Sequence, residues 1–500
     1  MNIGRRALLG GLPVFVATAP FAQERVAQER VAQERAAPTA PHFAPGRPDP
    51  LPAAQSRAHT LVLGGRTLRF TSATGSVTLT DGQGVAQAAV GYVAYTLDGA
   101  GANRPVTFAV NGGPGASSAW LHLGALGPWR LEMHGAAPSA PVRLIDNDET
   151  WLDFTDLVFI DPVGTGYSRF LATGEELRKQ VWSVGGDIDS IAGAMRRWLV
   201  QAGRMASPKF LAGESYGGFR GPRLARVLAQ SHGVGLSGLV LVSPVLDFGG
   251  RSTAMEPLYW ASALPTLAAA ARRAEGRVTD AEAYAAGEYV TDLLRGADPA
   301  AVARRSALVA ALTGLDPTLV RRHGGMIDGP IFMRNAPPLG KQGGRLASLY
   351  DLDVTLPDPD PTAAFSRQPD AVLDALRAPV TAAMLELYST RLGWRVEAPY
   401  ELLSEAVNRA WDWGGGRTAA ESMSHLRSAL ALDPALRVVV AHGLYDVVTP
   451  YFRSHLLLET IEPGAGRDRV ALHAWPGGHM FYSRQAGRAA LRAEVARLYP

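Results

Sequence analysis

Residues 209–218, KFLAGESYGG, contain the clearest structural signal in the chain. The first five, KFLAG, form a short apolar run typical of a buried strand, and residues 219–230, FRGPRLARVLAQ, have apolar side chains at helical spacing. Ser215 therefore falls on a tight turn between a strand and a helix. Such a turn needs glycine on both sides, because neighbouring side chains would clash with its strained backbone. We expect this turn to expose the serine hydroxyl at the edge of a sheet.

Apolar runs on either side of this turn predict further strands of the same sheet. They lie at 106–110, 157–160, 236–243 and 437–443. Residues 187–201 have helical periodicity, with Asp187 as the expected N-cap. Strands that alternate with crossover helices indicate an α/β fold with a mostly parallel, buried sheet flanked by helices.

The chain divides into segments of different composition. Residues 1–22 have the layout of an export signal. A repeat, AQERV AQERV AQERA, covers 22–36, and with the proline-rich stretch after it forms a predicted linker at 23–57. The predicted enzyme core comprises 58–250 and 431–500. Between its two parts, 251–430 is rich in Ala, Leu and Arg without a long β run, which predicts a helical lid inserted over the sheet.

Composition narrows the classes of function. The chain has 500 residues, 47% of them hydrophobic and 19% charged, so it can bury a large core. A formal charge of +3 is nearly balanced and gives no reason to expect a nucleic-acid partner. The absence of cysteine excludes disulfides, thiolate nucleophiles and cysteine metal sites. No H-E-x-x-H motif or dinucleotide fingerprint is present, so we expect neither a metal nor another cofactor.

The N-terminus predicts where the protein acts. Arg5 and Arg6 precede a short apolar run that ends in small residues, and this run is too short to span a bilayer comfortably. We therefore expect a periplasmic or secreted protein without a membrane anchor after cleavage of the signal. The paired arginines leave the twin-arginine route open, and the sequence does not predict the oligomeric state.

A serine hydroxyl becomes a useful nucleophile when a histidine takes its proton and an acid orients that histidine. In this type of sheet the order along the chain is Ser, acid, His. His479, in the Gly-rich loop WPGGHM, is the expected base for Ser215, and Asp446, directly after the run 437–443, is the expected acid. Asp446 could instead be a turn residue that caps a helix, and Asp247 is a competing acid.

The negative charge that develops during attack on a carbonyl needs backbone N–H donors. Residues 111–115, NGGPG, follow the run 106–110 and can supply one donor, from Gly113. The amide of Tyr216 can supply the other. The alternative interpretation of the glycines is an ordinary tight turn.

Four motifs together resemble the serine carboxypeptidase family. They are NGGPGASS (111–118), FIDPVGTGYS (159–168), GESYGG (213–218) and GHM (478–480), in that order. The resemblance implies an α/β-hydrolase fold and hydrolysis of C-terminal peptide bonds through an acyl-enzyme. The implied partner is a peptide substrate with a free C-terminus.

The resemblance also implies how that C-terminus is bound, namely by the side chain of Asn111, the backbone of Gly112 and the carboxyl group of Glu214. A protonated Glu214 could donate a hydrogen bond to a carboxylate, whereas an ionised one would repel it. The alternative is that Glu214 fills a variable position and contacts only backbone.

The sequence departs from the family pattern at three positions. Ala116 stands where the family usually has cysteine, Ala125 stands where it has a glutamate paired with the elbow glutamate, and the expected glutamine before Pro162 is missing. Without the second carboxylate, a like charge that would raise the pKa of Glu214 is lost. We therefore expect a pH optimum less acidic than is usual in the family, and a peak below about pH 5 would contradict this.

Two other functions remain open at this point. The same catalytic residues could hydrolyse an ester or pass the acyl group to an alcohol. Alternatively, the chain could be a non-catalytic binding protein built on a hydrolase scaffold, since a fold does not determine function. The presence of Ser, Asp, His and the oxyanion loop in the required order favours an enzyme.

Overall fold

The computed structural model describes residues 51–133, 140–250, 256–336, 344–360, 362, 370–414 and 419–500. The predicted export signal, 1–22, and the part of the predicted linker up to residue 50 lie outside the described residues. The predicted end of the linker at residue 57 is wrong. The first strand already begins at Gln55, because Gln55 to Arg57 pair with the neighbouring strand.

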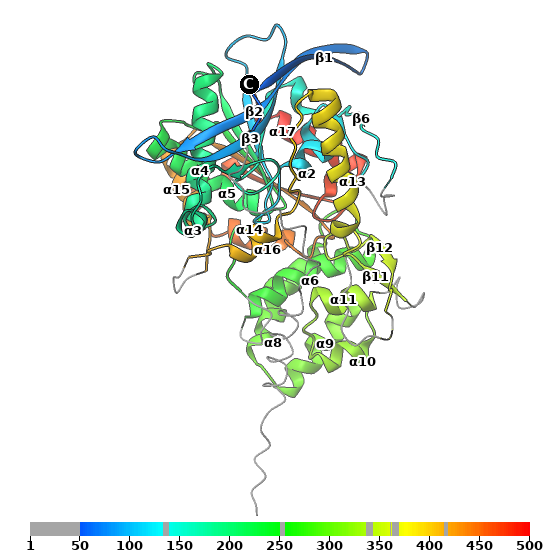
Figure 1. Ribbon diagram of the computed structural model, residues 1–500. Helices are drawn as coiled ribbons and strands as arrows, with labels where there is room; N and C mark the ends of the chain where they lie inside the picture. The colour runs from blue at the N-terminus through cyan, green and yellow to red at the C-terminus, as the bar shows by residue number, and fades with distance from the viewer. Residues whose placement is uncertain are drawn as a thin grey trace, which may run out of the picture. The chain divides into compact units, whose positions relative to one another are not determined.

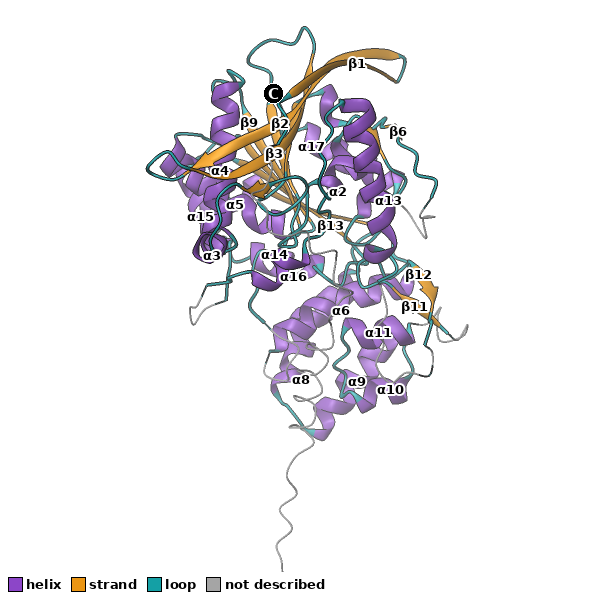
Figure 2. Cartoon of the chain, in the orientation of Figure 1, coloured by secondary structure: helices purple, strands orange, loops and turns teal. Residues whose placement is uncertain are grey.

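One large sheet organises the fold (Figures 1 and 2). In spatial order its main strands are β1 (Gln55–Leu63), β2 (Arg66–Thr80), β3 (Ala86–Leu97), β7 (Asp156–Ile160), β4 (Val106–Val110), β9 (Lys209–Glu214), β10 (Gly238–Val242), β13 (Arg437–Gly443) and β14 (Val470–Trp475). Strands β1, β2 and β3 form an antiparallel meander, and β3 pairs antiparallel with β7. From β7 to β14 every neighbouring pair is parallel. Short strand β8 (Arg169–Phe170) pairs with β3.

The predicted strands are confirmed, and with them the predicted α/β-hydrolase arrangement. The five apolar runs coincide with β4, β7, β9, β10 and β13 to within two residues at each end. Strands β4, β7 and β10 are buried along their whole length, as expected for parallel strands covered on both faces. Parallel strands end at one common edge, and there the loops after β4, β9, β10 and β13 bring distant parts of the sequence together.

Helices cover both faces of the sheet. Helices α4 (Val184–Gln201), α5 (Tyr216–His232) and α15 (Met423–Leu432) contribute to one hydrophobic cluster. Helices α2 (Ala119–Leu121), α13 (Leu373–Glu386) and α17 (Gln485–Ala496) contribute to a second, on the other face. Figure 1 shows the two groups on opposite sides of the strands. Shorter elements connect these helices and strands. They include α3 (Glu175–Val181), α14 (Glu405–Ala410), α16 (Tyr451–Leu458), β5 (Trp129–Arg130) and β6 (Ile145–Asp146).

The predicted N-cap of the helix at 187–201 is wrong. Helix α4 begins earlier, and the side chain of its N-cap, Ser183, accepts a hydrogen bond from the Gly186 N–H at 3.0 Å. Asp187 lies inside the helix, where it is buried and binds Arg220 of α5 through two hydrogen bonds of 2.7 and 3.0 Å. Arg220 also donates to the main-chain oxygen of Asn111. This buried ion pair thus supports the loop that begins at Asn111.

Some helices of the region 251–430 pack against one another, and others pack against the sheet. Helices α6 (Pro257–Arg272), α7 (Thr279–Tyr284), α8 (Val290–Leu294), α9 (Pro299–Thr313), α10 (Pro317–Arg322) and α11 (Gly329–Asn335) build a hydrophobic cluster of their own, to which residues of α16 also belong. Most of these helices lie together in the lower part of Figure 1, next to the short hairpin of β11 (Arg345–Ala347) and β12 (Thr355–Pro357). In contrast, α13 and α15 pack onto the sheet through side chains such as Val380 and Leu426.

In the part of the chain that the structure describes, no helix is long and apolar enough to cross a membrane.

Candidate active site

Ser215 sits on the turn between β9 and α5 with a backbone conformation that only a constrained site imposes. Its φ is 60° and its ψ is −120°, and its N–H donates to the Val242 oxygen of β10 at 2.9 Å. The flanking glycines are sterically required. A Cβ on Gly213 would lie 2.1 Å from the Gly217 oxygen, and one on Gly217 would lie 2.3 Å from the Val110 oxygen. The turn therefore has the geometry that the sequence predicts.

Asp446 and His479 form a buried hydrogen-bonded pair. The Nδ1 atom of His479 lies 2.7 Å from Oδ2 of Asp446, and both side chains are almost fully buried. The main-chain N–H groups of Val448 and Thr449 donate to Oδ1 of Asp446 at 2.9 and 3.0 Å, and the Thr449 hydroxyl donates to Oδ2 at 2.5 Å. Asp446 thus organises its own turn, as the capping alternative supposed, and also orients the imidazole. With Asp446 accepting at Nδ1, Nε2 is the ring nitrogen left to act as a base.

The main chain of His479 is held from two directions. Its N–H donates to the oxygen of Tyr350 at 2.5 Å, and its oxygen accepts from the Ser243 hydroxyl at 2.7 Å. The Tyr350 ring also meets the imidazole edge-on, with ring centroids 5.4 Å apart. A Cβ on Gly478 would lie 1.9 Å from the Tyr350 oxygen, so only glycine allows this approach. Tyr350 comes from the predicted lid, and no motif in the sequence predicts its contact with His479.

Ser215 and His479 line one cavity with a volume of about 420 Å³. In the described part of the chain, no hydrogen bond joins Nε2 of His479 to the Ser215 hydroxyl, and that hydroxyl has no other hydrogen-bond partner. Contacts between a nucleophile and its base are often long without substrate and shorten when substrate binds. The structure thus brings Asp446 and His479 into direct contact, and it brings Ser215 to the same cavity without the final hydrogen bond.

The surroundings of His479 raise the pKa of its imidazole. Burial alone would lower this pKa, but the charge and hydrogen bond of Asp446, together with the charge of Glu214, outweigh burial. The pKa is therefore raised above the ordinary value of 6.5. A higher pKa makes Nε2 a stronger proton acceptor once the ring is neutral.

Glu214 lies beside Ser215, is buried to 97% and lines the same cavity. Its Oε2 accepts two hydrogen bonds, from Nδ2 of Asn111 at 2.8 Å and from the hydroxyl of Tyr482 at 2.6 Å. Its Oε1 accepts none from a described residue. Burial raises the pKa of Glu214 and outweighs the effects of His479, Tyr482 and Asn111, which lower it. When Glu214 is protonated, the proton is expected on Oε1, because Oε2 already accepts two donors.

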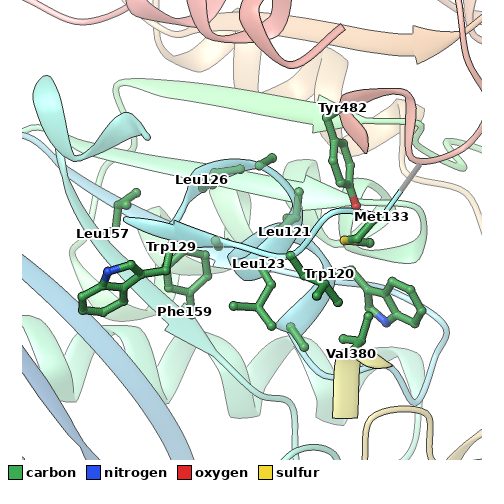
Figure 3. Close-up of a cluster of buried hydrophobic side chains, with 14 of the residues drawn as sticks. Trp120, Leu121, Leu123, Leu126, Trp129, Met133, Leu157, Phe159, Val380 and Tyr482 are labelled. Carbon is green, nitrogen blue, oxygen red and sulfur yellow. The ribbon is translucent and has the colours of Figure 1, made fainter. Parts of the chain in front are cut away.

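Tyr482 is a site residue that was not predicted from the sequence. Its ring reaches into the buried cluster around Met133 (Figure 3), and a Cβ on Gly124 would lie 2.4 Å from a ring carbon. Ala125, where the family usually has a glutamate, is buried in the same short helical segment as Gly124. The hydroxyl of Tyr482 thus supplies Glu214 with a polar partner although Ala125 cannot. The one signal in the sequence was its position three residues after His479.

The loop after β4 offers unused backbone donors. The N–H groups of Gly112 and Gly113 donate to no described residue, and both glycines line the cavity. Asn111 is fixed beneath them, since its Oδ1 accepts from the Leu121 N–H at 2.9 Å. The main chain of Tyr216 begins α5, and its nitrogen would lie 2.4 Å from a Cβ on Gly112. The predicted oxyanion and carboxylate donors are therefore gathered around Ser215.

The competing acid, Asp247, is not hydrogen-bonded to His479. Asp247 also lines the cavity, but its Oδ1 accepts from the Gly249 N–H at 2.5 Å and makes no contact with His479. A second histidine of this region, His473, lies within β14, with Nε2 at 3.7 Å from Glu494. Among the described residues, no three His, Cys, Asp or Glu side chains are grouped closely enough to hold a metal ion.

Comparison with known proteins points to one family. Residues 65–274 match the sequence profile of the serine carboxypeptidase family. This stretch contains Asn111, Glu214 and Ser215, and it ends before Asp446 and His479.

Individual relatives match over shorter stretches. Serine carboxypeptidase-like 45 of Arabidopsis thaliana is 27% identical over 173 residues, which cover 32% of this chain and 34% of that protein. A pheromone-processing carboxypeptidase of Talaromyces marneffei is 34% identical over 136 residues, which cover 26% of this chain and 19% of that protein. The matches thus span about a third or less of the length of these curated relatives. Among solved structures, a proline iminopeptidase of Mycobacterium smegmatis has 14% identity and a TM-score of 0.36, over 85% of this chain and 97% of that one.

Proposed function

We propose that this chain is an exported serine carboxypeptidase, which removes C-terminal residues from peptides with Ser215 as nucleophile, His479 as base and Asp446 as the orienting acid. The family match over 65–274 and the hydrogen bond between His479 and Asp446 support this proposal.

The observation that carries the proposal is the environment of Glu214. A plain esterase needs a nucleophile, a base and oxyanion donors, but it has no use for a buried carboxyl group with a raised pKa beside the nucleophile. A protonated Oε1 can donate to a substrate carboxylate. The second hydrogen on Nδ2 of Asn111 and the unused N–H of Gly112 can donate to the same group. Three neutral donors on one side of Ser215 suit a free peptide C-terminus.

The reaction follows from these positions. The oxygen of Ser215 attacks the carbonyl carbon of the last peptide bond, and its proton passes to Nε2 of His479. The N–H groups of Gly113 and Tyr216 stabilise the oxyanion that forms. The C–N bond then breaks, and the leaving amino acid takes the proton from His479. Water attacks the acyl-enzyme and passes a proton to His479; the ester bond then breaks, the serine oxygen takes the proton from His479, and the shortened peptide leaves.

A blocked dipeptide with a free carboxylate and its C-terminal amide provide the direct test. We expect kcat/KM for the free acid to exceed that for the amide by about 100-fold or more, because the amide replaces one acceptor oxygen by an N–H group, which would face a donor and leave it unpaired. Steady-state kinetics with both substrates measure this ratio. Equal rates would contradict carboxypeptidase action and would favour a plain esterase or amidase. Transfer of the acyl group to added alcohol in preference to water would favour an acyltransferase.

The pH dependence of kcat/KM should have two limbs of different origin. His479 must be neutral to accept a proton, so activity should rise with pH through a value above 6.5. Glu214 must be protonated to bind the carboxylate, so activity should fall as pH rises through its raised pKa. In Glu214→Gln, the amide keeps a donor that does not titrate, and the alkaline limb should disappear while the acid limb remains. A wild-type peak below about pH 5, or an unchanged alkaline limb in the variant, would contradict this assignment.

Export is proposed from the sequence of residues 1–22 alone. N-terminal sequencing of the mature protein isolated from its native cells checks it, and a retained Met1 would contradict a cleaved signal.

A further inference from the structure

The catalytic cavity has a cationic residue that the reaction proposed above does not use. Arg453 lies in the first turn of α16, half-buried, and lines the cavity together with Ser215. One of its nitrogens donates to the main-chain oxygen of Gly249. No described carboxylate lies within 4.0 Å of its guanidinium, and Asp247, the acidic residue of the neighbouring loop, is engaged by the Gly249 N–H. The remaining donors of Arg453 are thus available to a ligand.

The loop opposite Arg453 leaves space beside the guanidinium. Gly250 has a φ of 83°, and a Cβ at this position would lie 3.3 Å from Nη1 of Arg453. Because residue 250 is glycine, no side chain of this residue comes between it and the guanidinium. The guanidinium is planar and carries paired N–H donors. Among the common charged groups of peptide side chains, a carboxylate matches this arrangement best.

The order of the strands indicates which part of a substrate would reach Arg453. The groups proposed to bind the C-terminal carboxylate follow β4 and β9, and Ser215 lies at the end of β9. Arg453 and the loop 247–250 follow β13 and β10, on the other side of Ser215. Consider a peptide whose C-terminus is bound and whose last peptide bond lies at Ser215. Its penultimate residue, which precedes that bond, therefore lies on the side of Arg453.

We propose that Arg453 determines specificity by binding the carboxylate side chain of an acidic residue at the penultimate position of the peptide. This inference rests on the carboxypeptidase function proposed above, and it adds the class of substrate that the site prefers. A charge-assisted hydrogen bond in a partly desolvated cavity corresponds to roughly a tenfold to hundredfold preference.

The test uses two N-blocked dipeptides, Glu-Leu and Gln-Leu, which differ in charge at the penultimate residue and hardly in shape. With the full-length enzyme near neutral pH, we expect kcat/KM to be about tenfold or more higher for Glu-Leu. In Arg453→Gln this ratio should fall to about one, because the variant loses the charge that favours Glu-Leu. In Arg453→Glu the preference should move to the corresponding Lys-Leu dipeptide. Arg427→Gln, on α15 and outside the cavity lining, is the matched control and should keep the wild-type ratio.

The outcomes separate this inference from the function on which it rests. If the wild type cleaves both dipeptides equally well, Arg453 does not select the substrate, although carboxypeptidase action stands. If Arg453→Gln weakens cleavage of both dipeptides by the same factor, Arg453 only holds the loop at Gly249, and the proposal is again overturned. If neither dipeptide nor any other peptide with a free C-terminus is cleaved, the carboxypeptidase function itself fails, and the proposed specificity fails with it.

Discussion

Replacing Ser215 by alanine is expected to lower kcat by roughly 10⁶-fold, to the level that binding and oxyanion donors alone provide. Alanine removes one oxygen and keeps the Cβ, so the turn at 215 should retain its backbone conformation and the protein its stability. Turnover of a blocked dipeptide gives the size of the effect. Unchanged circular dichroism and melting temperature would establish that the variant is folded.

Labelling with a fluorophosphonate probe makes this experiment specific. The probe forms a covalent bond with an activated serine, so Ser215→Ala should not be labelled. Ser262 lines the same cavity, but its hydroxyl donates to the Tyr259 oxygen at 2.9 Å, and Ser262→Ala should label like the wild type. Labelling that survives in Ser215→Ala and disappears in Ser262→Ala would identify another nucleophile. If the wild type is not labelled at all, the chain is better explained as a non-catalytic protein on this fold.

Asp446→Asn is expected to lower kcat by roughly 10⁴-fold with little change in KM. The asparagine oxygen can still accept the N–H groups of Val448 and Thr449, so the turn should survive. Its amide nitrogen, however, would donate to Nδ1 of His479. The imidazole would then carry its proton on Nε2 and could not accept one from Ser215. The variant also lacks the negative charge that stabilises the imidazolium during the reaction.

Asp247→Asn is the matched control for this experiment. Asp247 follows the neighbouring strand and lines the same cavity without touching His479, so its variant should stay within about tenfold of the wild type. The reverse pattern, with Asp247→Asn inactive and Asp446→Asn active, would show that Asp247 is the acid and would contradict the role proposed for Asp446. A melting temperature for each variant separates loss of catalysis from loss of fold.

The elements that could be predicted from the sequence are those whose signal is local. The apolar runs at 106–110 and 437–443 coincide with β4 and β13, because a strand buried on both faces needs an uninterrupted apolar stretch. The turn at Ser215 could be predicted because its glycines are required by contacts with residues nearby in the sequence and with the adjacent strand.

The contacts that could not be predicted depend on residues far apart in the sequence. Tyr482 reaches Glu214 across 268 positions, and no spacing rule links them. Asp187 resembles an N-cap in the sequence, but in the fold it binds Arg220, so the cap is Ser183 instead. A tertiary ion pair of this kind overrides a local preference because a buried arginine without a partner would be far more costly than a lost cap.

The contact between Tyr350 and His479 has a consequence for any attempt to simplify this protein. One of the two supports of the histidine main chain belongs to the sheet, through Ser243, and the other belongs to the segment inserted between the two halves of the core. A truncated protein without the inserted segment would have a more open cavity, because Tyr350 is part of its lining. It would also lose the hydrogen bond from the His479 N–H to Tyr350 and keep only the one from Ser243. If the proposed mechanism holds, a smaller working catalyst would have to keep at least the stretch around Tyr350.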